Sequence, residues 1–368
     1  MAVDKNDLSL ARQEINEVDE EMARLFVRRM HAVARVAAYK IAHGLPIYDE
    51  ARENEVIARN AARVEEEELR AFYVQYLSEG MRVSRRYQEK LVNGMKVAYS
   101  GVEGAFASIA AKKIFPCAAR VPYPDFRAAY DAVVSGDCDC AVLPIENSTA
   151  GEVGNVFDML FAGQLYIAGV YDLFINQNLL ALPGTRPEDV RTVISHPQAL
   201  AQCADYLRRG KYHTKPFENT ALAARHVLET GDRTQAAIAS DETAELYGLE
   251  IIAKNINEEN INMTRFAVLT RAVNESPAEQ GRHSIIMFNV SDEAGSLCKA
   301  IDVISSYGYN MRCLRSRPMK GLMWQYYFYV EIEGNLSSPH GKEMLEDLRH
   351  CCDKLKMLGS FTYPAELR

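Results

Sequence analysis

The sequence predicts a multidomain chain in which an all-helical segment precedes a layered α/β segment and a smaller α+β segment. Residues 1–93 carry apolar positions at helical spacing and no convincing strand pattern. Strand and helix patterns then alternate from 95 to 273. From 282 to 361 the order becomes strand, helix, strand, strand, helix, strand, which is typical of ferredoxin-like domains. A chain of 368 residues is long enough for two or three such domains.

The composition is that of a globular protein, with 48% hydrophobic and 25% charged residues. A net charge of −8 provides no field that attracts phosphate backbones, so we expect no nucleic-acid partner. No apolar leader and no run of about 18 apolar residues occurs, so we expect a cytoplasmic protein without a membrane partner. The eight cysteines form no CxxC pair and no zinc-like spacing. We therefore expect reduced thiols, no metal site and no cofactor.

The first helix is predicted to be unusually long. Its apolar stripe runs from Leu8 to Ile41, on the order of 50 Å of helix, and it ends at the Gly44–Pro46 interruption. Two further helices are predicted near 49–64 and 66–92. A domain of this size cannot cover so long a stripe alone, so we expect a homodimer or a higher even oligomer.

Three cations, Arg12, Arg29 and Lys40, interrupt the stripe of the first helix that should be buried. Burial of unpaired cations is costly, so these side chains should face anions. They could instead extend to the surface or pair with glutamates of another helix. Further polar residues that could complete a polar pocket follow downstream: Asp49, Arg52, Glu53, Ser84 and Gln88.

The spacing of these eight residues resembles that of the all-helical chorismate mutase family, and all eight positions match. The resemblance implies that Arg12 of the partner chain, Arg29 and Arg52 bind the two carboxylates of chorismate. Lys40 and Gln88 would donate to the ether oxygen, where negative charge develops during the pericyclic rearrangement. Three more residues would orient the substrate hydroxyl: Asp49, Glu53 and Ser84.

The second segment begins after Asn93-Gly94 with a strand at Lys96–Ser100, a glycine turn and a helix from about Ala105. Strands and helices then alternate, which predicts largely parallel sheets in two lobes. The most distinct expected strands are Cys140–Ile145, Thr192–Ser195, Ala236–Ala239 and Phe266–Thr270.

Four ordered motifs place polar groups at the ends of these strands. The first, Tyr99–Phe106, contains a glycine turn that could bind an anion at a helix N-terminus or could be a plain tight connection. The others are Pro144–Val153, Ser195–Cys203 and Asn262–Phe266. Together they resemble the prephenate dehydratase family over residues 95–273. The resemblance implies a two-lobed fold like that of periplasmic binding proteins, with prephenate in the cleft.

Thr264 is the leading catalytic residue that this resemblance implies. Loss of CO2 and of the ring hydroxyl is driven by aromatisation, so the leaving hydroxyl must receive a proton or a hydrogen bond. A threonine is a poor acid, so Thr264 either stabilises the leaving group or relays a proton from a stronger acid, with Glu146 as a candidate. His196 is interpreted as a helix cap rather than a catalytic acid. The remaining implied substrate-binding residues are Asn147, Ser148, Ser195, Gln202, Arg265 and Phe266.

A polar linker is expected at 274–282, before the third segment. The elements of that segment are predicted as strand His283–Val290, helix Gly295–Ser306, strands 309–317 and 323–332, helix 341–352 and a closing strand.

This segment resembles the ACT family attached to such dehydratases, whose ligand would be phenylalanine. The family typically carries Gly-Ala-Leu and Glu-Ser-Arg-Pro, where this chain has Gly-Ser-Leu and Arg-Ser-Arg-Pro. The cation at Arg315 would repel an amino-acid ammonium, which leaves open the identity of the effector and the strength of inhibition. A purely structural dimerisation module is the alternative. The implied effector-binding residues are Gly295, Ser296, Leu297, Arg315, Ser316, Arg317 and Pro318.

The combined resemblance implies a bifunctional enzyme of phenylalanine biosynthesis. It would rearrange chorismate to prephenate and then dehydrate and decarboxylate prephenate to phenylpyruvate. Two alternatives stay open for the second segment: arogenate dehydratase activity, and a non-catalytic sensor of a small anion.

Overall fold

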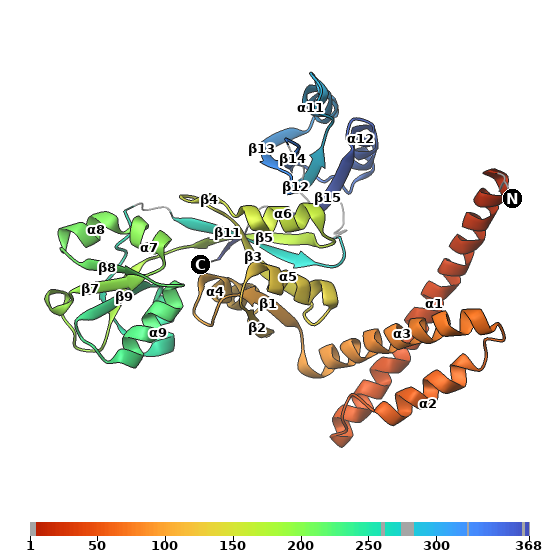
Figure 1. Cartoon of the computed structure of the whole chain (residues 1–368), viewed down its shortest axis with the longest axis horizontal. Helices are drawn as coiled ribbons and strands as arrows, with labels where there is room; N and C mark the ends of the chain where they lie inside the picture. The colour runs from red at the N-terminus through yellow and green to blue at the C-terminus, as the bar shows by residue number, and fades with distance from the viewer. Residues whose placement is uncertain (1–4, 259–261, 274–282, 322–323, 363–364, 368) are drawn as a thin grey trace. The chain divides into compact units, whose positions relative to one another are not determined.

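The chain folds into two compact units, Met1–Met95 and Lys96–Arg368, which are described separately. The computed structural model describes residues 5–258, 262–273, 283–321, 324–362 and 365–367 (Figure 1). The predicted linker 274–282 lies outside these ranges. No helix among the described residues has the length and apolar character needed to cross a bilayer.

The first unit is all-helical, as the sequence predicts. Helices α1 (Lys5–His43) and α2 (Glu50–Ala61) both pack against α3 (Glu67–Asn93). Helix α2 begins after Asp49, whose carboxylate accepts a hydrogen bond from the backbone N–H of Arg52 at 3.0 Å. This N-cap satisfies one of the amides that a helix start leaves unpaired. The α1–α2 connection therefore has a defined conformation.

The second unit contains a mixed sheet. This sheet and the helices that pack on it are here called lobe I. Its strand order is β16-β5-β11-β3-β1-β2, with β4 paired to β3. β1 is parallel to β2 and β3, whereas β11 is antiparallel to β3 and β5. The strands are β1 (Lys96–Ser100), β2 (Ala119–Tyr123), β3 (Cys140–Asn147), β4 (Gly151–Glu152), β5 (Tyr166–Phe174), β11 (Met263–Thr270) and β16 (Ala365–Leu367). The helices are α4 (Phe106–Ile114), α5 (Phe126–Ser135) and α6 (Gly154–Ala162).

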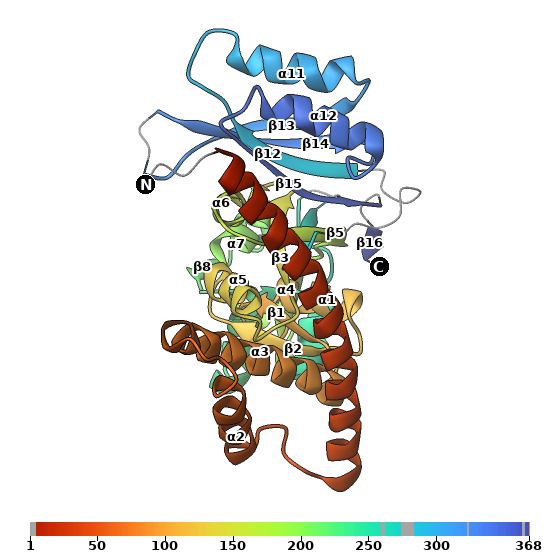
Figure 2. The same cartoon turned by 90° about the vertical axis from the view of Figure 1, so that its right-hand side faces the viewer.

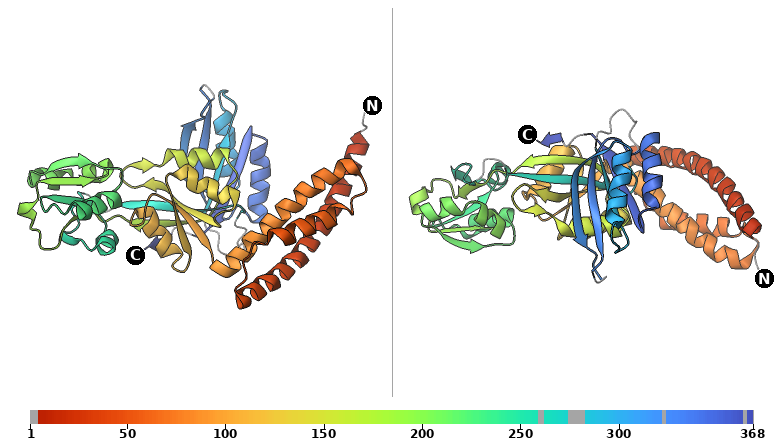
Figure 3. Two further views of the ribbon diagram at one scale, coloured as in Figure 1. Left: turned by 60° about the horizontal axis from the view of Figure 1, so that its bottom comes forward. Right: turned by 90° about the horizontal axis from the view of Figure 1, so that it is seen from above.

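Lobe II, drawn in green in Figure 3, holds a five-stranded sheet of order β10-β6-β9-β7-β8. β7 is parallel to β8 and β9, and β6 is antiparallel to β9 and β10. The strands are β6 (Asn178–Ala181), β7 (Thr192–Ser195), β8 (His213–Pro216), β9 (Gln235–Ala239) and β10 (Glu250–Ala253). The helices are α7 (Pro197–Gln202), α8 (Ala204–Arg209), α9 (Thr220–Thr230), α10 (Asp241–Tyr247) and the 3-10 turn η1 (Pro187–Asp189).

The prediction of largely parallel sheets is wrong, because both sheets are mixed. The chain leaves lobe I through β5 and returns to it through β11. A strand that returns beside the strand that left runs in the opposite direction, so β11 pairs antiparallel with β5. The crossing between lobes thus sets the strand direction, which a local pattern of strands and helices does not reveal.

The third part, here called the C-terminal segment (residues 283–361), has the predicted strand and helix order. Its antiparallel sheet runs β13-β14-β12-β15, and Figure 2 shows both helices on one face. The elements are β12 (His283–Asn289), α11 (Ser296–Ser306), β13 (Asn310–Pro318), β14 (Tyr326–Glu333), α12 (Pro339–Arg349) and β15 (Lys354–Phe361).

Lobe I and the C-terminal segment share one apolar core. The Phe157 ring meets the Tyr329 ring edge-on at 4.6 Å between centroids, and Phe161 stacks on Tyr327 at 4.5 Å. The close approach of the two parts also requires a glycine at position 359 of β15, because a side chain there would collide with the carbonyl of Ile167. Burial of each large apolar side chain contributes about 1.5–3 kcal/mol. The C-terminal segment is therefore packed onto lobe I.

Candidate active sites

In the helical unit, α1 and α3 bring three of the predicted residues together. The Arg29 guanidinium donates to the hydroxyl of Ser84 and reaches the carbonyl of Gly80 at 3.4 Å. Gln88 lies one turn further along α3 and is 8% exposed. Its Nε2 donates to the Ser84 carbonyl at 3.4 Å, while Oε1 has no hydrogen-bond partner among the described residues. A buried amide whose oxygen can still accept a hydrogen bond is suited to binding a polar ligand.

The turn between α1 and α2 positions a second group. Half-buried Lys40 donates to the carbonyl of Ile47, close to the Asp49 cap. Glu53 of α2 pairs with Arg85 of α3, a residue that no sequence motif singles out. The Arg85 guanidinium also lies 5.1 Å from the centroid of the Tyr48 ring. A cation between a carboxylate and a ring is held in place.

Two predicted arginines lie apart from this group. Arg52 is exposed and pairs with Glu55 at 2.6 Å along its own helix. Arg12 belongs to residues 7–29 of α1, all of which are exposed in a single chain. The stripe that the sequence predicts to be buried is exposed there too, with Ile15 at 59% and Leu25 at 60%.

In the second unit, a cavity of about 180 Å³ lies between the lobes. Lobe I contributes residues at the start of α4, the end of β3 and the start of β11, and lobe II contributes α7 and the start of α9. No carboxylate is among the described residues that line it. The polar lining residues are Asn147, Gln177, His196, Gln198, Gln202, Asn219, Thr220 and Thr264.

Thr264 and Asn147 are opposite each other in the β11–β3 register. Asn147 Nδ2 lies 2.9 Å from Thr264 Oγ1, and also contacts the Met263 carbonyl and the Asn262 side-chain oxygen. Asn147 Oδ1 accepts from the backbone N–H groups of Thr149 and Ala150, which fixes the amide orientation. The oxygen of Thr264 therefore accepts a hydrogen bond, and its proton is left to donate to a ligand.

Gln202 extends this network toward lobe II. Its Nε2 donates to Thr149 Oγ1 at 2.8 Å, and its Oε1 accepts from Asn262 at 3.0 Å and from Gln177 at 3.4 Å. Gln177 is 2% exposed, and its own Oε1 has no partner among the described residues. Neutral amides thus dominate the cavity wall.

His196 caps α7, as the sequence analysis interprets it. Its Nδ1 accepts from the backbone N–H of Gln198 at 3.2 Å, so Nε2 carries the proton of the neutral ring. Burial lowers the pKa of His196 below 6.5, which keeps the ring uncharged near neutral pH. The same ring lines the cavity, so the cap is also a candidate substrate contact. Gln177 and Asn219 also line the cavity but were not predicted from the sequence, because neither belongs to a recognised motif.

Three predicted substrate-binding residues do not line the cavity. Ser195 is fully buried and donates to the carbonyl of Ile238 at 2.7 Å. Ser148 accepts from the backbone N–H of Met263 at 3.0 Å, and Phe266 is 1% exposed. These side chains hold strands together, which corrects their assignment to substrate.

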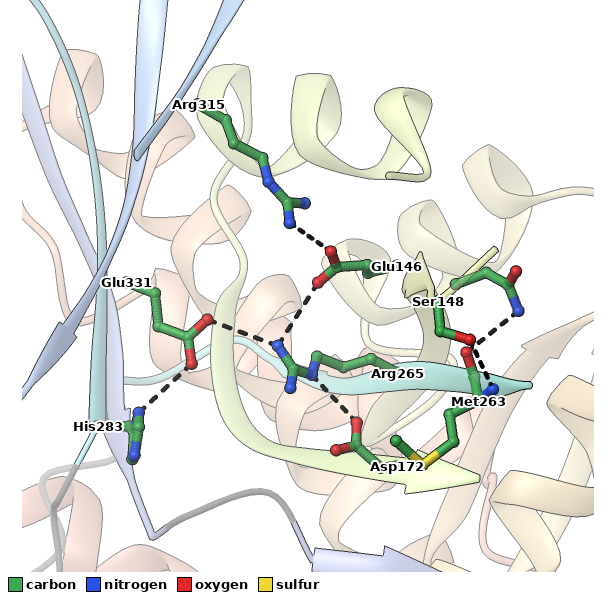
Figure 4. A network of polar contacts seen from close by, with 9 residues as sticks. Glu146, Ser148, Asp172, Met263, Arg265, His283, Arg315 and Glu331 are labelled. Atoms are coloured by element: carbon green, nitrogen blue, oxygen red, sulfur yellow. Dashed lines mark hydrogen bonds and ion pairs between the residues drawn. The ribbon is translucent and has the colours of Figure 1, made fainter. Parts of the chain in front are cut away.

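Glu146 and Arg265 point away from Thr264. Successive side chains in a strand alternate between faces, so they lie on the face opposite Asn147 and Thr264. Glu146 pairs there with Arg315 and with Arg265 at 3.5 Å (Figure 4). The structure does not bring Glu146 to Thr264, because Glu146 projects from the opposite face of the sheet. We therefore do not retain Glu146 as a proton donor, nor Arg265 as a substrate contact.

The predicted effector residues fall into two groups. Gly295 precedes α11 in a left-handed conformation (φ 88°), followed by buried Ser296 and half-buried Leu297. On β13, Ser316 and Pro318 are exposed, and the two arginines are half-buried against lobe I. Arg315 pairs with Glu146, and Arg317 with Glu152 and Asp158. Arg315 therefore has a carboxylate partner in lobe I, and the expected repulsion of an amino-acid ammonium stays a prediction.

Comparison with known proteins agrees with this division of the chain. The family model of prephenate dehydratase matches residues 97–274, and that of chorismate mutase type II matches 11–89. A bifunctional chorismate mutase/prephenate dehydratase of Buchnera aphidicola subsp. Acyrthosiphon pisum is 30% identical over 98% of this chain and 97% of its own. Arogenate dehydratase/prephenate dehydratase 2 of Arabidopsis thaliana is 35% identical over 76% of each chain. A prephenate dehydratase from Arthrobacter aurescens, solved in complex with L-Phe, superposes with a TM-score of 0.67 at 26% identity, covering 74% of this chain and 93% of that one.

The helical unit and the two-lobed α/β fold therefore define an enzyme of aromatic amino acid biosynthesis that joins an isomerase to a lyase. The chain belongs to the bifunctional chorismate mutase/prephenate dehydratase family. It rearranges chorismate to prephenate and converts prephenate to phenylpyruvate, so the non-catalytic alternative is set aside.

Proposed function

We propose that the mutase site is built on Arg29, Lys40 and Gln88 and is completed by Arg12 of a second copy of the chain. Arg29 and Arg12 would bind the substrate carboxylates, and Lys40 and Gln88 would donate to the ether oxygen as charge develops there. Support comes from the Arg29–Ser84–Gln88 cluster and from the long exposed face of α1. Asp49, Arg52, Glu53 and Ser84 complete the proposed site.

In the proposed dehydratase mechanism, Thr264 donates a hydrogen bond to the leaving ring hydroxyl. The carboxylate C–C bond breaks to release CO2, its electron pair enters the ring, and the C–O bond breaks as the ring becomes aromatic. The hydroxide that departs takes up a proton from the solvent and leaves as water. Asn147 supports this role, because its donation to Thr264 Oγ1 directs the threonine proton elsewhere. Gln202 and the N-terminus of α4 would hold the carboxylates of the substrate.

The cavity favours prephenate over arogenate. The two substrates differ at one side-chain carbon, which bears a keto oxygen in prephenate and an ammonium in arogenate. An ammonium needs an anionic partner when it leaves water, and no carboxylate is among the described lining residues. Neutral amide donors such as Gln177 and Asn219 suit a keto oxygen. The fused mutase also produces prephenate directly.

We further propose that phenylalanine is a feedback ligand of the C-terminal segment and that the enzyme works as a homodimer or a higher even oligomer. The relative from Arthrobacter aurescens was solved with L-Phe, and the segment resembles the ACT family. The proposed domains are 1–93 for the mutase, 95–273 for the dehydratase and 282–361 for the regulatory domain.

One coupled assay tests the proposed site and its substrate preference. The full chain is supplied with chorismate, prephenate or arogenate, and phenylpyruvate or phenylalanine is measured against an enzyme-free blank. We expect turnover of chorismate and prephenate and a kcat/KM for arogenate at least ~10-fold lower, as an unpaired ammonium would impose. Equal use of arogenate would overturn the substrate assignment.

A further inference from the structure

An ion-pair network connects the C-terminal segment to the back of the dehydratase strands. Arg315 of β13 pairs with Glu146 of β3, which also pairs with Arg265 of β11. Arg265 in turn contacts Asp172 of β5 at 3.0 Å and Glu331 of β14 at 3.5 Å. Figure 4 shows these side chains converging from both parts of the unit.

Arg315 offsets an excess of negative charge in this network. Arg265 is surrounded by three carboxylates, those of Glu146, Asp172 and Glu331, whose side chains are 27%, 14% and 10% exposed. Partly buried charges are poorly screened, so the carboxylates repel one another unless a second cation is present. Arg315, 32% exposed, supplies that cation and contacts the most exposed of the three.

The network lies directly behind the catalytic pair. Glu146 precedes Asn147 on β3, and Arg265 follows Thr264 on β11. The β3–β11 register shifts between Arg265 and Phe266, so the regular ladder is interrupted beside the catalytic pair. A β-bulge redirects nearby side chains and leaves the strand locally less constrained by pairing. Side-chain contacts on the rear face therefore act on the same short stretches of β3 and β11 that carry Asn147 and Thr264.

We propose that Arg315 is a positioning residue for the dehydratase reaction, acting through Glu146 and Arg265 on the Asn147–Thr264 pair. The C-terminal segment thereby contributes to turnover through one named contact, in addition to any ligand that it binds. The inference rests on the proposed role of Thr264 in the dehydratase site.

The test uses the full chain with Arg315→Lys, Arg315→Met and Arg315→Glu. We expect kcat for prephenate to fall in the order Arg, Lys, Met, Glu, by ~10-fold at Met, with KM changed less than ~2-fold. Arg349→Glu is the matched control, because Arg349 is exposed and pairs with Glu346 on its own helix at 2.8 Å. Mutase rates on chorismate should stay unchanged in every variant.

A double-mutant cycle identifies the route of the effect. In a Glu146→Gln background, Arg315→Met should change kcat by less than ~2-fold, since its partner charge is already gone. An equal loss in both backgrounds would overturn the proposal, as would a Met variant at least as active as the Lys variant. If Arg315→Glu fails to fold, the Lys and Met variants carry the test. If Thr264→Val keeps dehydratase activity, the assignment of the dehydratase site is wrong. If Thr264→Val is inactive and every Arg315 variant keeps the wild-type kcat, only the proposed role of Arg315 is overturned.

Discussion

Asn147 donates to the hydroxyl oxygen of Thr264 across two paired strands, with 2.9 Å between Nδ2 and Oγ1. Because the amide of Asn147 is itself held by the backbone of Thr149 and Ala150, the threonine proton is directed away from Asn147.

Replacement of Thr264 tests this directly. Thr264→Val keeps the shape but removes the donor, so phenylpyruvate formation from prephenate should fall by ~100-fold or more, whereas Thr264→Ser should keep most of it. Chorismate should still be consumed, with accumulation of prephenate. Product formation by uncatalysed decomposition of prephenate at low pH is subtracted. Unchanged dehydration in Thr264→Val would refute the role.

The mutase site should depend on Arg29. Arg29→Ala removes the guanidinium that meets Ser84, and loss of one such donor costs about 3–4 kcal/mol in the transition state. Chorismate turnover should collapse while dehydration of supplied prephenate continues. Arg24→Ala serves as control, since Arg24 is exposed and pairs with Glu20 on the same helix. Wild-type mutase rates in Arg29→Ala would contradict the assignment.

His196 should make stability depend on pH. Its folded-state pKa lies below the unfolded value of 6.5, so the unfolded chain binds more protons in that range. The stability from the neutral ring is therefore present above about pH 6.5 and is lost as the pH falls toward the lowered pKa. His196→Asn keeps a capping acceptor and removes the titration. Denaturant unfolding at about pH 7.5 and pH 5 should show a smaller loss for His196→Asn than for the wild type, and equal losses would exclude this contribution.

Complementation should reveal the shared mutase site. Arg12→Ala and Lys40→Ala chains should each be inactive as mutases, because each lacks a charge needed for substrate binding or catalysis. Mixed after unfolding and refolding together, hybrid dimers should regain one intact site, and mutase activity should return in part. Sedimentation of the wild type should give an even oligomer. A fully active monomer, or no recovery in the mixture, would argue against a contribution of Arg12 across chains.

Phenylalanine should bind the C-terminal segment and lower the dehydratase rate, with a coupling of about 1–3 kcal/mol. Calorimetric titration with phenylalanine, tyrosine and tryptophan, with rates measured in parallel, identifies the effector. Binding of a different amino acid would reassign it. No binding up to millimolar concentrations would leave the segment a structural module.

The sequence predicts the helices and most strands because their periodic patterns are local. Opposite faces for Glu146 and Asn147 could also have been predicted, since a strand alternates its side chains. Contacts between distant segments, such as that of Glu146 with Arg315, carry no local signal. The place of Ser195 depends on Ile238 in a neighbouring strand, which only the fold reveals. Arg12 is exposed in a single chain, so the contacts of one chain do not fix the position of its side chain.

The last described strand, β16, pairs in parallel with β5 through Ala365, Glu366 and Leu367. β5 thus lies between β11, which precedes the C-terminal segment, and β16, which follows it. The strands on either side of the segment in the sequence, β11 and β16, therefore both pair with β5. The two attachments limit how far the segment can move relative to β5. Deletion of β16 should release one tether and also expose the edge of β5 to other chains.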